Sequence, residues 1–488
     1  MKNVQTFAAV AAFATTALAQ MTPMAKLEAR ATSTASGSAT VTSTTTLPTI
    51  TTRGNAFFNG TSDEDRFYIR GVDYQPGGSS TASDPLADYA TCSRDIPYFQ
   101  KLGLNTIRVY TVDNSKSHDE CMAALANAGI YLALDVNTPE YSLNRDEPAE
   151  SYNAVYLQSI FATIDAFQNY SNTLLFFSGN EVINTANSTS AAPYVKAVTR
   201  DMRQYIGERG YRSIPVGYSA ADVSSNQYLM AQYMDCGSTA SRSDFYAINN
   251  YEWCDPSSYT TSGWSQLVDQ YSNYSLPLFM SEYGCITNTR TFKESAALYQ
   301  EDMTSVFSGG LVYEYSEEGN GYGIVTISGD TVTPVDDQFS DLQTELASTS
   351  DPSSGGNYST TGVAQDCPAQ SDDWDTSPFT GTALPATPSG AEKYFEDGAG
   401  TGPGLSGSGS QESGDGKVST AASDAGSVST TYTGTTSVAS ATGSSSSSSA
   451  SSSGSPSSAA GRSVAMGMAP FVCGLAVAIS FCMGAVLL

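Results

Sequence analysis

Two glutamates stand at the ends of apolar, strand-like runs. Glu181 closes the run over residues 174–181, and Glu282 closes the run over residues 277–282. Two carboxylates so placed predict a glycosidase. In a retaining enzyme one carboxylic acid protonates the leaving oxygen while a second carboxylate attacks the sugar from the other side, with the carboxyl groups about 5 Å apart. The rest of the chain must therefore bring these two strand ends together.

Other polar and aromatic residues occupy similar positions. Asn180, directly before Glu181, is placed to bond a sugar hydroxyl beside the reacting carbon, although an Asn there is equally able to cap the next helix. Asp135 ends another apolar run, where a helix cap or a buried ion pair is the alternative. Aromatic rings at strand ends can stack on sugars, but each taken singly is also compatible with ordinary packing. This group, with one glutamine, comprises Tyr74, Gln75, Tyr110, Tyr251, Trp253, Tyr283, Tyr313 and Tyr315.

Eight apolar, β-branched runs alternate with segments of helical periodicity. The predicted strands cover residues 67–73, 105–111, 131–136, 174–181, 213–219, 245–251, 277–282 and 310–315. The predicted helices cover residues 90–102, 119–128, 152–167, 193–209, 262–271, 292–307 and 337–346. Alternation predicts a parallel sheet, and eight units predict a closed (β/α)8 TIM barrel with its site at the C-terminal strand ends. A doubly wound open sheet is disfavoured because no glycine-rich phosphate loop follows the first strand. Glu181 and Glu282 then end strands 4 and 7, on roughly opposite sides of the barrel mouth.

Composition predicts how the chain is divided. Residues 1–19 read as a secretory signal peptide, followed by a Ser/Thr-rich segment over 20–44 and the (β/α)8 catalytic domain over 45–370. A disordered Ser/Gly-rich stalk is expected over 371–458. Residues 459–488 read as a glycosylphosphatidylinositol (GPI) attachment signal that is removed from the mature form, with a retained membrane helix as the alternative. The protein is therefore expected outside the cell, on the outer face of the plasma membrane or transferred to the wall.

Six cysteines precede the terminal signal, which implies three disulfides but allows fifteen pairings. The barrel order narrows the choice. Neighbouring helices 1 and 2 carry Cys92 and Cys121, and the loops after strands 6 and 7 carry Cys254 and Cys285, which leaves Cys236 for Cys367. The sequence also contains glycosylation sequons at Asn59, Asn169, Asn187, Asn273 and Asn357.

The charge and the scarcity of histidine exclude several classes of function. A formal charge of -27 argues against nucleic-acid partners, whose phosphates would be repelled, although solubility alone accounts for most of this charge. The single histidine, His118, leaves no basis for Ser-His-Asp catalysis, and no metal site or cofactor is implied. A neutral polymer is a suitable substrate.

Five segments make the chain similar to a known family. They are residues 71–78, 108–110, 179–181, 251–254 and 281–285, and they closely resemble fungal cell-wall 1,3-β-glucanosyltransferases of glycoside hydrolase family 72. The likeness runs from about residue 45 to about residue 367. It implies that Glu181 is the general acid/base and Glu282 the nucleophile. It also implies a glucan groove lined by Gln75, Tyr110, Asp135, Asn180, Tyr251 and Tyr313.

The implied reaction is a retaining double displacement. Glu282 attacks an internal β-1,3 linkage, and Glu181 then activates the non-reducing end of another glucan instead of water, which elongates that chain. A hydrolytic β-1,3-glucanase and a non-catalytic wall protein are the alternatives. The family often carries a cysteine-rich carbohydrate-binding module after the barrel. Cys367 is the last cysteine before the terminal signal, so this module is expected to be absent. A chain with an exposed stalk is expected to be a monomer.

Overall fold

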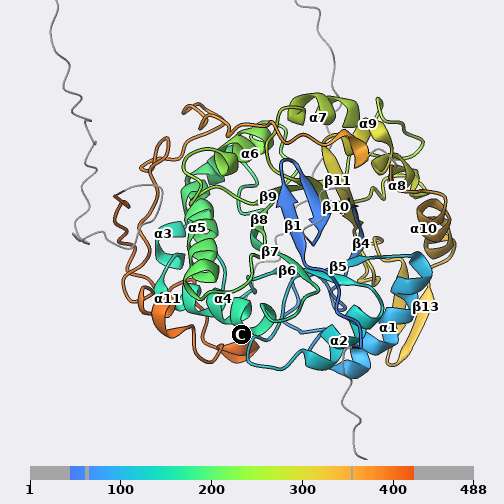
Figure 1. The fold of residues 1–488 in the computed structure, drawn as a ribbon, viewed down its shortest axis with the longest axis horizontal. Helices are drawn as coiled ribbons and strands as arrows, with labels where there is room; N and C mark the ends of the chain where they lie inside the picture. Colours follow the sequence, from blue (N-terminus) through green and yellow to red (C-terminus); the bar gives the residue numbers. More distant parts are fainter. Residues whose placement is uncertain (1–43, 61–64, 353–354, 423–488) are drawn as a thin grey trace, which may run out of the picture. The chain divides into compact units, whose positions relative to one another are not determined.

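The computed structural model describes residues 44–60, 65–352 and 355–422. Its centre is a closed barrel of eight parallel strands surrounded by helices (Figure 1). In barrel order from the first strand, these are β4 (Ile69–Asp73), β5 (Thr106–Val109), β6 (Tyr131–Asp135), β7 (Thr173–Asn180), β8 (Val216–Ala220), β9 (Phe245–Asn250), β10 (Leu278–Tyr283) and β11 (Phe307–Val312). The predicted (β/α)8 TIM barrel is confirmed, with each strand displaced by a few residues at most.

The helices form the outer ring, and their ends follow local sequence signals. Helix α1 begins after Asp88, whose carboxylate accepts from the Ala90 amide, and it ends at Gly103 in the left-handed conformation. The α-helices are α1 (Tyr89–Leu102), α2 (Asp119–Asn127), α3 (Pro148–Ser151), α4 (Ala154–Phe167), α5 (Ala192–Glu208), α6 (Gln227–Asp235), α7 (Trp264–Tyr271), α8 (Lys293–Leu298), α9 (Glu301–Thr304), α10 (Gln338–Ala347) and α11 (Lys393–Asp397). Short 3-10 turns occur at η1 (Ala186–Ala191), η2 (Gly355–Asn357) and η3 (Gly404–Ser406).

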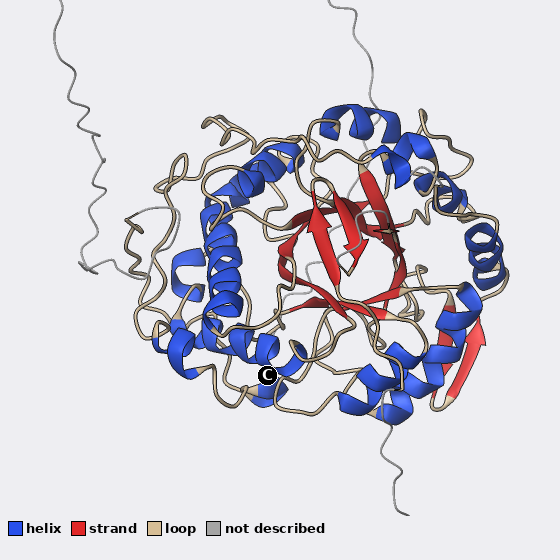
Figure 2. Ribbon diagram, in the orientation of Figure 1, coloured by secondary structure: helices blue, strands red, loops and turns tan. Residues whose placement is uncertain are grey.

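A small antiparallel sheet closes the N-terminal end of the barrel. It consists of β1 (Ile50–Arg53), β2 (Ala56–Asn59) and β3 (Arg66–Phe67), and it lies in front of the barrel in Figure 2. The Phe57 ring packs edge-on against Phe279 and tilted against Phe245, with centroids 5.9 and 6.3 Å apart. The barrel is therefore plugged with apolar side chains at this end, and its chemistry is confined to the other.

Two further features differ from the sequence prediction. The single helix predicted over residues 292–307 is wrong, because α8 and α9 are separate short helices and β11 already begins at Phe307. A hairpin of β12 (Val325–Ser328) and β13 (Thr331–Pro334) follows the last barrel strand. Within the described residues, no helix combines the length and apolar character needed to cross a membrane.

The C-terminal boundary of the folded part also needs correction. A stalk was predicted from residue 371, but residues 371–422 pack against the barrel, and Trp374, Phe379 and Phe395 are buried. Enough apolar side chains are present in this segment to hold it on the helices, which a Ser/Gly-rich stalk could not do. The remainder of the predicted stalk, the signal peptide and the GPI signal lie outside the described residues.

Three disulfides join elements that the barrel brings together. Cys92 pairs with Cys121, Cys254 with Cys285, and Cys236 with Cys367, which are the pairs predicted above. The Cys254–Cys285 bond links the loops that follow β9 and β10, beside the two strand ends that carry Tyr251 and Glu282. It therefore fixes one side of the barrel mouth.

Candidate active site

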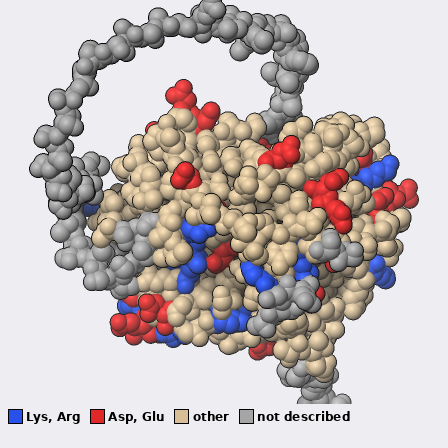
Figure 3. All heavy atoms as spheres, turned by 45° about the horizontal axis from the view of Figure 1, so that its top comes forward, with Lys and Arg blue, Asp and Glu red and all other residues tan. Residues whose placement is uncertain are grey.

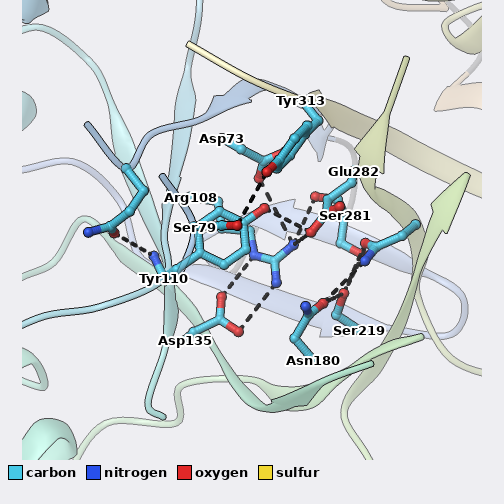
Figure 4. Close-up of polar contacts among 12 residues, drawn as sticks. Asp73, Ser79, Arg108, Tyr110, Asp135, Asn180, Ser219, Ser281, Glu282 and Tyr313 are labelled. Atoms are coloured by element: carbon cyan, nitrogen blue, oxygen red, sulfur yellow. Dashed lines mark hydrogen bonds and ion pairs between the residues drawn. The ribbon is translucent and has the colours of Figure 1, made fainter. Parts of the chain in front are cut away.

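Both predicted catalytic glutamates lie at the C-terminal end of the barrel. Glu181 directly follows β7, and Glu282 is within β10. The residues drawn in Figure 4 converge from β4, β5, β6, β7, β8, β10 and the segment after β11. The two carboxylates are near enough for the charge of Glu181 to act on the pKa of Glu282.

The carboxylate of Glu282 is buried and held by three donors. Its Oε1 accepts from the Tyr110 hydroxyl at 2.8 Å and from Arg108 Nη1 at 3.1 Å, and its Oε2 accepts from the Tyr251 hydroxyl at 2.6 Å. Burial raises the pKa of Glu282 to about 7, and the charge of Glu181 adds to this effect, while Arg108 and the two hydroxyls oppose it. These donors fix the carboxylate in one orientation and favour its ionised form.

Arg108 is the cation at the centre of the site. It is fully buried, and its Nε and Nη2 donate to the two oxygens of Asp135 at 2.8 and 3.3 Å. Its guanidinium also lies over the rings of Tyr110 and Phe177, 4.3 and 4.5 Å from their centroids. Asp135 is thus committed to a buried ion pair, which was the alternative reading of this residue.

Asp73 lies on the other side of the same arginine. Its side chain is fully buried, neither carboxyl oxygen has a hydrogen-bond partner within the described residues, and its Oδ1 is 4.0 Å from Arg108 Nη1. Burial raises the pKa of Asp73 well above its usual range, and the charges of Glu282, Glu314 and Asp135 add to the effect of burial. Burial therefore disfavours the charged form of Asp73.

Glu181 has a different environment. Its backbone is in the left-handed region, with φ 50°, a conformation that costs a residue other than glycine about 1–3 kcal/mol. Hydrogen bonds hold it there: its amide donates to Ser219 O at 2.9 Å, and its carbonyl accepts from Arg145 Nη2 at 2.8 Å. Its carboxylate accepts from Asn249 Nδ2 at 2.7 Å, and the residue is half-buried. Fewer side chains therefore hold the carboxylate of Glu181 than that of Glu282.

A network of amides and hydroxyls connects the two glutamate strands. Ser219 Oγ donates to Asn180 Oδ1 at 2.6 Å, and Asn249 Nδ2 approaches the same oxygen at 3.2 Å. Ser281 Oγ donates to Asn249 Oδ1 at 2.8 Å. Because its oxygen accepts these bonds, Asn180 has its amide nitrogen left to donate to a sugar hydroxyl.

Three tyrosines form an aromatic cluster beside Glu282. The rings of Tyr251, Tyr313 and Tyr322 pack edge to face, with centroids 5.3 to 6.2 Å apart. The Tyr313 hydroxyl is 3.2 Å from Ser79 Oγ. The cluster presents apolar rings and hydroxyls at the mouth of the barrel, a combination that suits a sugar.

Gln75 is buried within the site. Its Oε1 accepts from the amides of Tyr110 and Thr111 at 3.2 and 3.1 Å, and its Nε2 donates to Ser83 O at 2.8 Å. In this structure Gln75 therefore fixes the backbone beside Tyr110, and direct contact with a glucan stays a prediction.

A cleft of about 310 Å³ opens beside these residues. Tyr110, Asp135 and Asn180 line it, together with Thr138, Pro139, Ser142, Leu143 and Arg145 from the loop after β6. The cleft adjoins Glu181 through its chain neighbours Asn180 and Val182, while neither glutamate is itself among the lining residues. A larger cavity of about 760 Å³ lies elsewhere, between residues 149–155 and residues 386–419. The surface in Figure 3 carries its acidic side chains in separate groups with lysines and arginines between them.

The structure thus brings the predicted site residues together at the barrel mouth. Some of the aromatic residues predicted at strand ends lie away from the two glutamates. Tyr74 and Tyr315 point into the core, where both hydroxyls donate to Asp95. Trp253 packs against Trp264. Of the sequons, Asn169, Asn187, Asn273 and Asn357 are exposed and Asn59 is half-buried, so sugar attachment stays a prediction for all five.

Sequence reasoning missed several residues of the site, among them Arg108, Asn249 and Tyr322. Arg108 was quoted only as part of a motif, although an arginine within an apolar strand signals a buried carboxylate partner. Asn249 follows the apolar run of β9, and a search for polar residues at every strand end would have found it. Tyr322 lies beyond the last barrel strand, where no periodic signal marks it.

Comparisons with known proteins agree with this geometry. A family model for glycoside hydrolase family 72, described as glucanosyltransferase, matches residues 39–350. The 1,3-beta-glucanosyltransferase gel1 of Aspergillus fumigatus is 63% identical over 358 residues, which cover 73% of this chain and 78% of that protein. The 1,3-beta-glucanosyltransferase GAS5 of Saccharomyces cerevisiae is 53% identical over 356 residues, which cover 72% of each. A mutant of Saccharomyces cerevisiae Gas2p in complex with laminaritetraose and laminaripentaose superposes with a TM-score of 0.65 and 38% identity, over 71% of this chain and 76% of that one.

Proposed function

The chain belongs to the glucanosyltransferases of glycoside hydrolase family 72, and from that premise we propose that it elongates β-1,3-glucan. It cleaves one β-1,3-glucan internally and transfers the new reducing end to the non-reducing end of another. The names of the relatives and the laminari-oligosaccharides bound to Gas2p support this substrate. No cofactor is needed for the reaction.

The unequal surroundings of the two glutamates carry the assignment of roles. Glu282 accepts from Arg108 and two tyrosines, so it is oriented and stabilised as an anion, which suits a nucleophile. Glu181 is half-buried and its carboxylate accepts from one side-chain amide, and these less restrictive surroundings suit a general acid/base.

The reaction then follows in two steps. Glu282 Oε attacks the anomeric carbon as Glu181 gives its proton to the departing glycosidic oxygen, and a covalent glycosyl-enzyme forms. Glu181, now a carboxylate, takes the proton from the hydroxyl of the acceptor glucan, whose oxygen displaces Glu282. The amide nitrogen of Asn180 donates to the sugar hydroxyl beside the reacting carbon, and the rings of Tyr251 and Tyr313 pack on the sugar.

Product analysis tests the proposal. Purified protein incubated with a reduced laminari-oligosaccharide should yield products longer than the starting chain. A protein that gives shorter products alone is a hydrolytic β-1,3-glucanase with the same two glutamates. A folded protein with no turnover is a non-catalytic wall component.

Substitution of each glutamate tests the roles. Glu181→Gln and Glu282→Gln should each abolish turnover while the circular dichroism spectrum and Tm stay close to those of the wild type. Wild-type activity in either variant removes that glutamate from the mechanism. Addition of azide should restore partial activity to a Glu282→Ala variant with inversion at the anomeric carbon, because the anion takes the place of the missing nucleophile.

The proposal includes the location of the enzyme. Three disulfides are typical of an oxidising compartment, and we propose that the chain works as a monomer outside the cell, held to the membrane by a GPI anchor. Phosphatidylinositol-specific phospholipase C should release it from intact cells. Retention after that treatment argues against the anchor, and a molar mass of twice the monomer by light scattering argues against the monomer.

A further inference from the structure

Residues 371–422 form a segment on the outside of the barrel that we call the strap. It lies beyond residues 39–350, which the family model matches. In Figure 1 it is the orange chain that runs beside α3, α4 and α5. Its apolar side chains fill gaps between helices: Phe379 packs against Tyr194, and Phe395 against Phe161, with centroids 5.6 and 5.5 Å apart.

Buried polar contacts also tie the strap to helix α5. Arg200 and Asp201 are both buried, and Arg200 Nη1 donates to Pro385 O at 2.8 Å. Asp201 Oδ1 accepts from Thr387 Oγ1 at 2.8 Å. Arg200 and Asp201 also pair with each other, with Arg200 Nη2 2.8 Å from Asp201 Oδ1, so the strap bonds to a buried ion pair and this part of it is fixed to the barrel.

The strap then reaches the loop that connects β6 to α3, residues 136–147. The Ser410 amide donates to Glu140 O at 2.9 Å. Gln411 Nε2 donates to Ser142 Oγ at 2.8 Å and approaches Pro139 O at 3.3 Å. Three backbone or side-chain bonds therefore join the strap to the middle of this loop.

The same loop is a wall of the cleft. Thr138, Pro139, Ser142 and Leu143 line the 310 Å³ cleft together with Asp135 and Asn180. Arg145, near the end of the loop, donates to the carbonyl of Glu181 and so supports its left-handed backbone. A continuous chain of contacts thus runs from the strap through the loop to the backbone of the acid/base residue.

We propose that the strap positions the β6–α3 loop as a wall of the glucan cleft, with Gln411 as the positioning residue at the contact. The strap acts on how the cleft holds a glucan and does not touch the reacting atoms. That the cleft holds glucan rests on the proposed function. The positioning of the loop does not depend on it.

A matched pair of glutamine variants of the full chain tests this inference. Gln411→Ala removes two strap bonds at the cleft wall, whereas Gln158→Ala removes two strap bonds at helix α4, where Gln158 Nε2 donates to Ala399 O and Thr401 O, both at 2.9 Å. Both glutamines are half-buried. We expect Gln411→Ala to raise KM for laminari-oligosaccharides about fivefold, the equivalent of one hydrogen bond, with kcat changed less than twofold. Gln158→Ala should leave KM within twofold, and the two variants should share the same Tm.

Hydrogen exchange provides a readout that needs no activity. Amides of residues 138–145 should exchange faster in Gln411→Ala than in Gln158→Ala, and Gln411→Lys, which keeps N–H donors, should recover part of the protection. Equal exchange of this loop in the two alanine variants, or equal KM values in active enzyme, overturns the inference. A wild-type protein without glucan turnover refutes the proposed function. In that case the comparison of hydrogen exchange between the two alanine variants still tests whether the strap positions the loop.

Discussion

Replacing Tyr251 with phenylalanine should move the acid limb of the pH–rate profile. The Tyr251 hydroxyl donates to Glu282 Oε2 at 2.6 Å, and this bond favours the carboxylate. In the proposed mechanism Glu282 attacks only when it is ionised, so kcat/KM should fall as the pH drops below the pKa of Glu282. Loss of the hydroxyl raises this pKa further, and the fall in activity should therefore begin at a higher pH.

The size of the change follows from the contact. A hydrogen bond to a charged group contributes about 1.5–3 kcal/mol, and about 1.4 kcal/mol corresponds to one pH unit. The pKa of Glu282 is already raised to about 7 by burial. The acid limb in Tyr251→Phe should therefore lie about one to two pH units above that of the wild type.

The assay is kcat/KM for a reduced laminari-oligosaccharide over a range of pH, because this ratio reports the free enzyme. Tyr322→Phe is the matched control. Its ring belongs to the same aromatic cluster, 5.7 Å from that of Tyr251, but no hydrogen bond joins its hydroxyl to Glu282 within the described residues. An unchanged acid limb in Tyr251→Phe, or an equal displacement in Tyr322→Phe, would refute this account of the nucleophile.

Three further substitutions test the rest of the site and the fold. Arg108→Met should lower the free energy of unfolding by about 3–5 kcal/mol at pH 7, measured by urea denaturation, because Asp135 loses its buried partner. Asp73→Asn should keep kcat/KM within about threefold at pH 7, because neither carboxyl oxygen accepts a hydrogen bond within the described residues and burial raises the pKa of Asp73, which disfavours its charged form; a hundredfold loss would mean that the charge of this carboxylate is needed. Replacing Cys236 and Cys367 together with serine should cost about 5 kcal/mol, because their disulfide closes a loop with a separation of 131 residues, and an unchanged Tm would contradict this.

The barrel could be predicted from the sequence because its strands are buried on both faces. Such strands appear as short apolar runs, and most of them are followed by a segment of helical period, although α6 (Gln227–Asp235) was not predicted. The positions of Glu181 and Glu282 then follow from the strand count. Their partners do not, because Tyr110 and Arg108 reach Glu282 across sequence separations of 172 and 174 residues, which no local pattern encodes.

The small antiparallel sheet of β1, β2 and β3 and the strap were not predicted, for a different reason. Strands β1 and β2 have four residues each, too few to establish alternation. The strap contains glycine, serine and proline at a density typical of a stalk, and its buried side chains, such as Trp374 and Phe395, follow no period. Each fills a gap that exists only once the helices have packed, so composition alone favoured disorder.

The proposed division of labour between the glutamates has its origin in strand β5. Both carboxylates occupy equivalent strand ends, so position in the barrel does not distinguish them. Arg108 and Tyr110, both carried by the segment at the end of β5, extend across the mouth to Glu282 and not to Glu181. A cation and a hydroxyl stabilise negative charge, and the same neighbours would keep a general acid deprotonated. The residue that they contact is therefore the one suited to hold the sugar, and Glu181 is left with the proton.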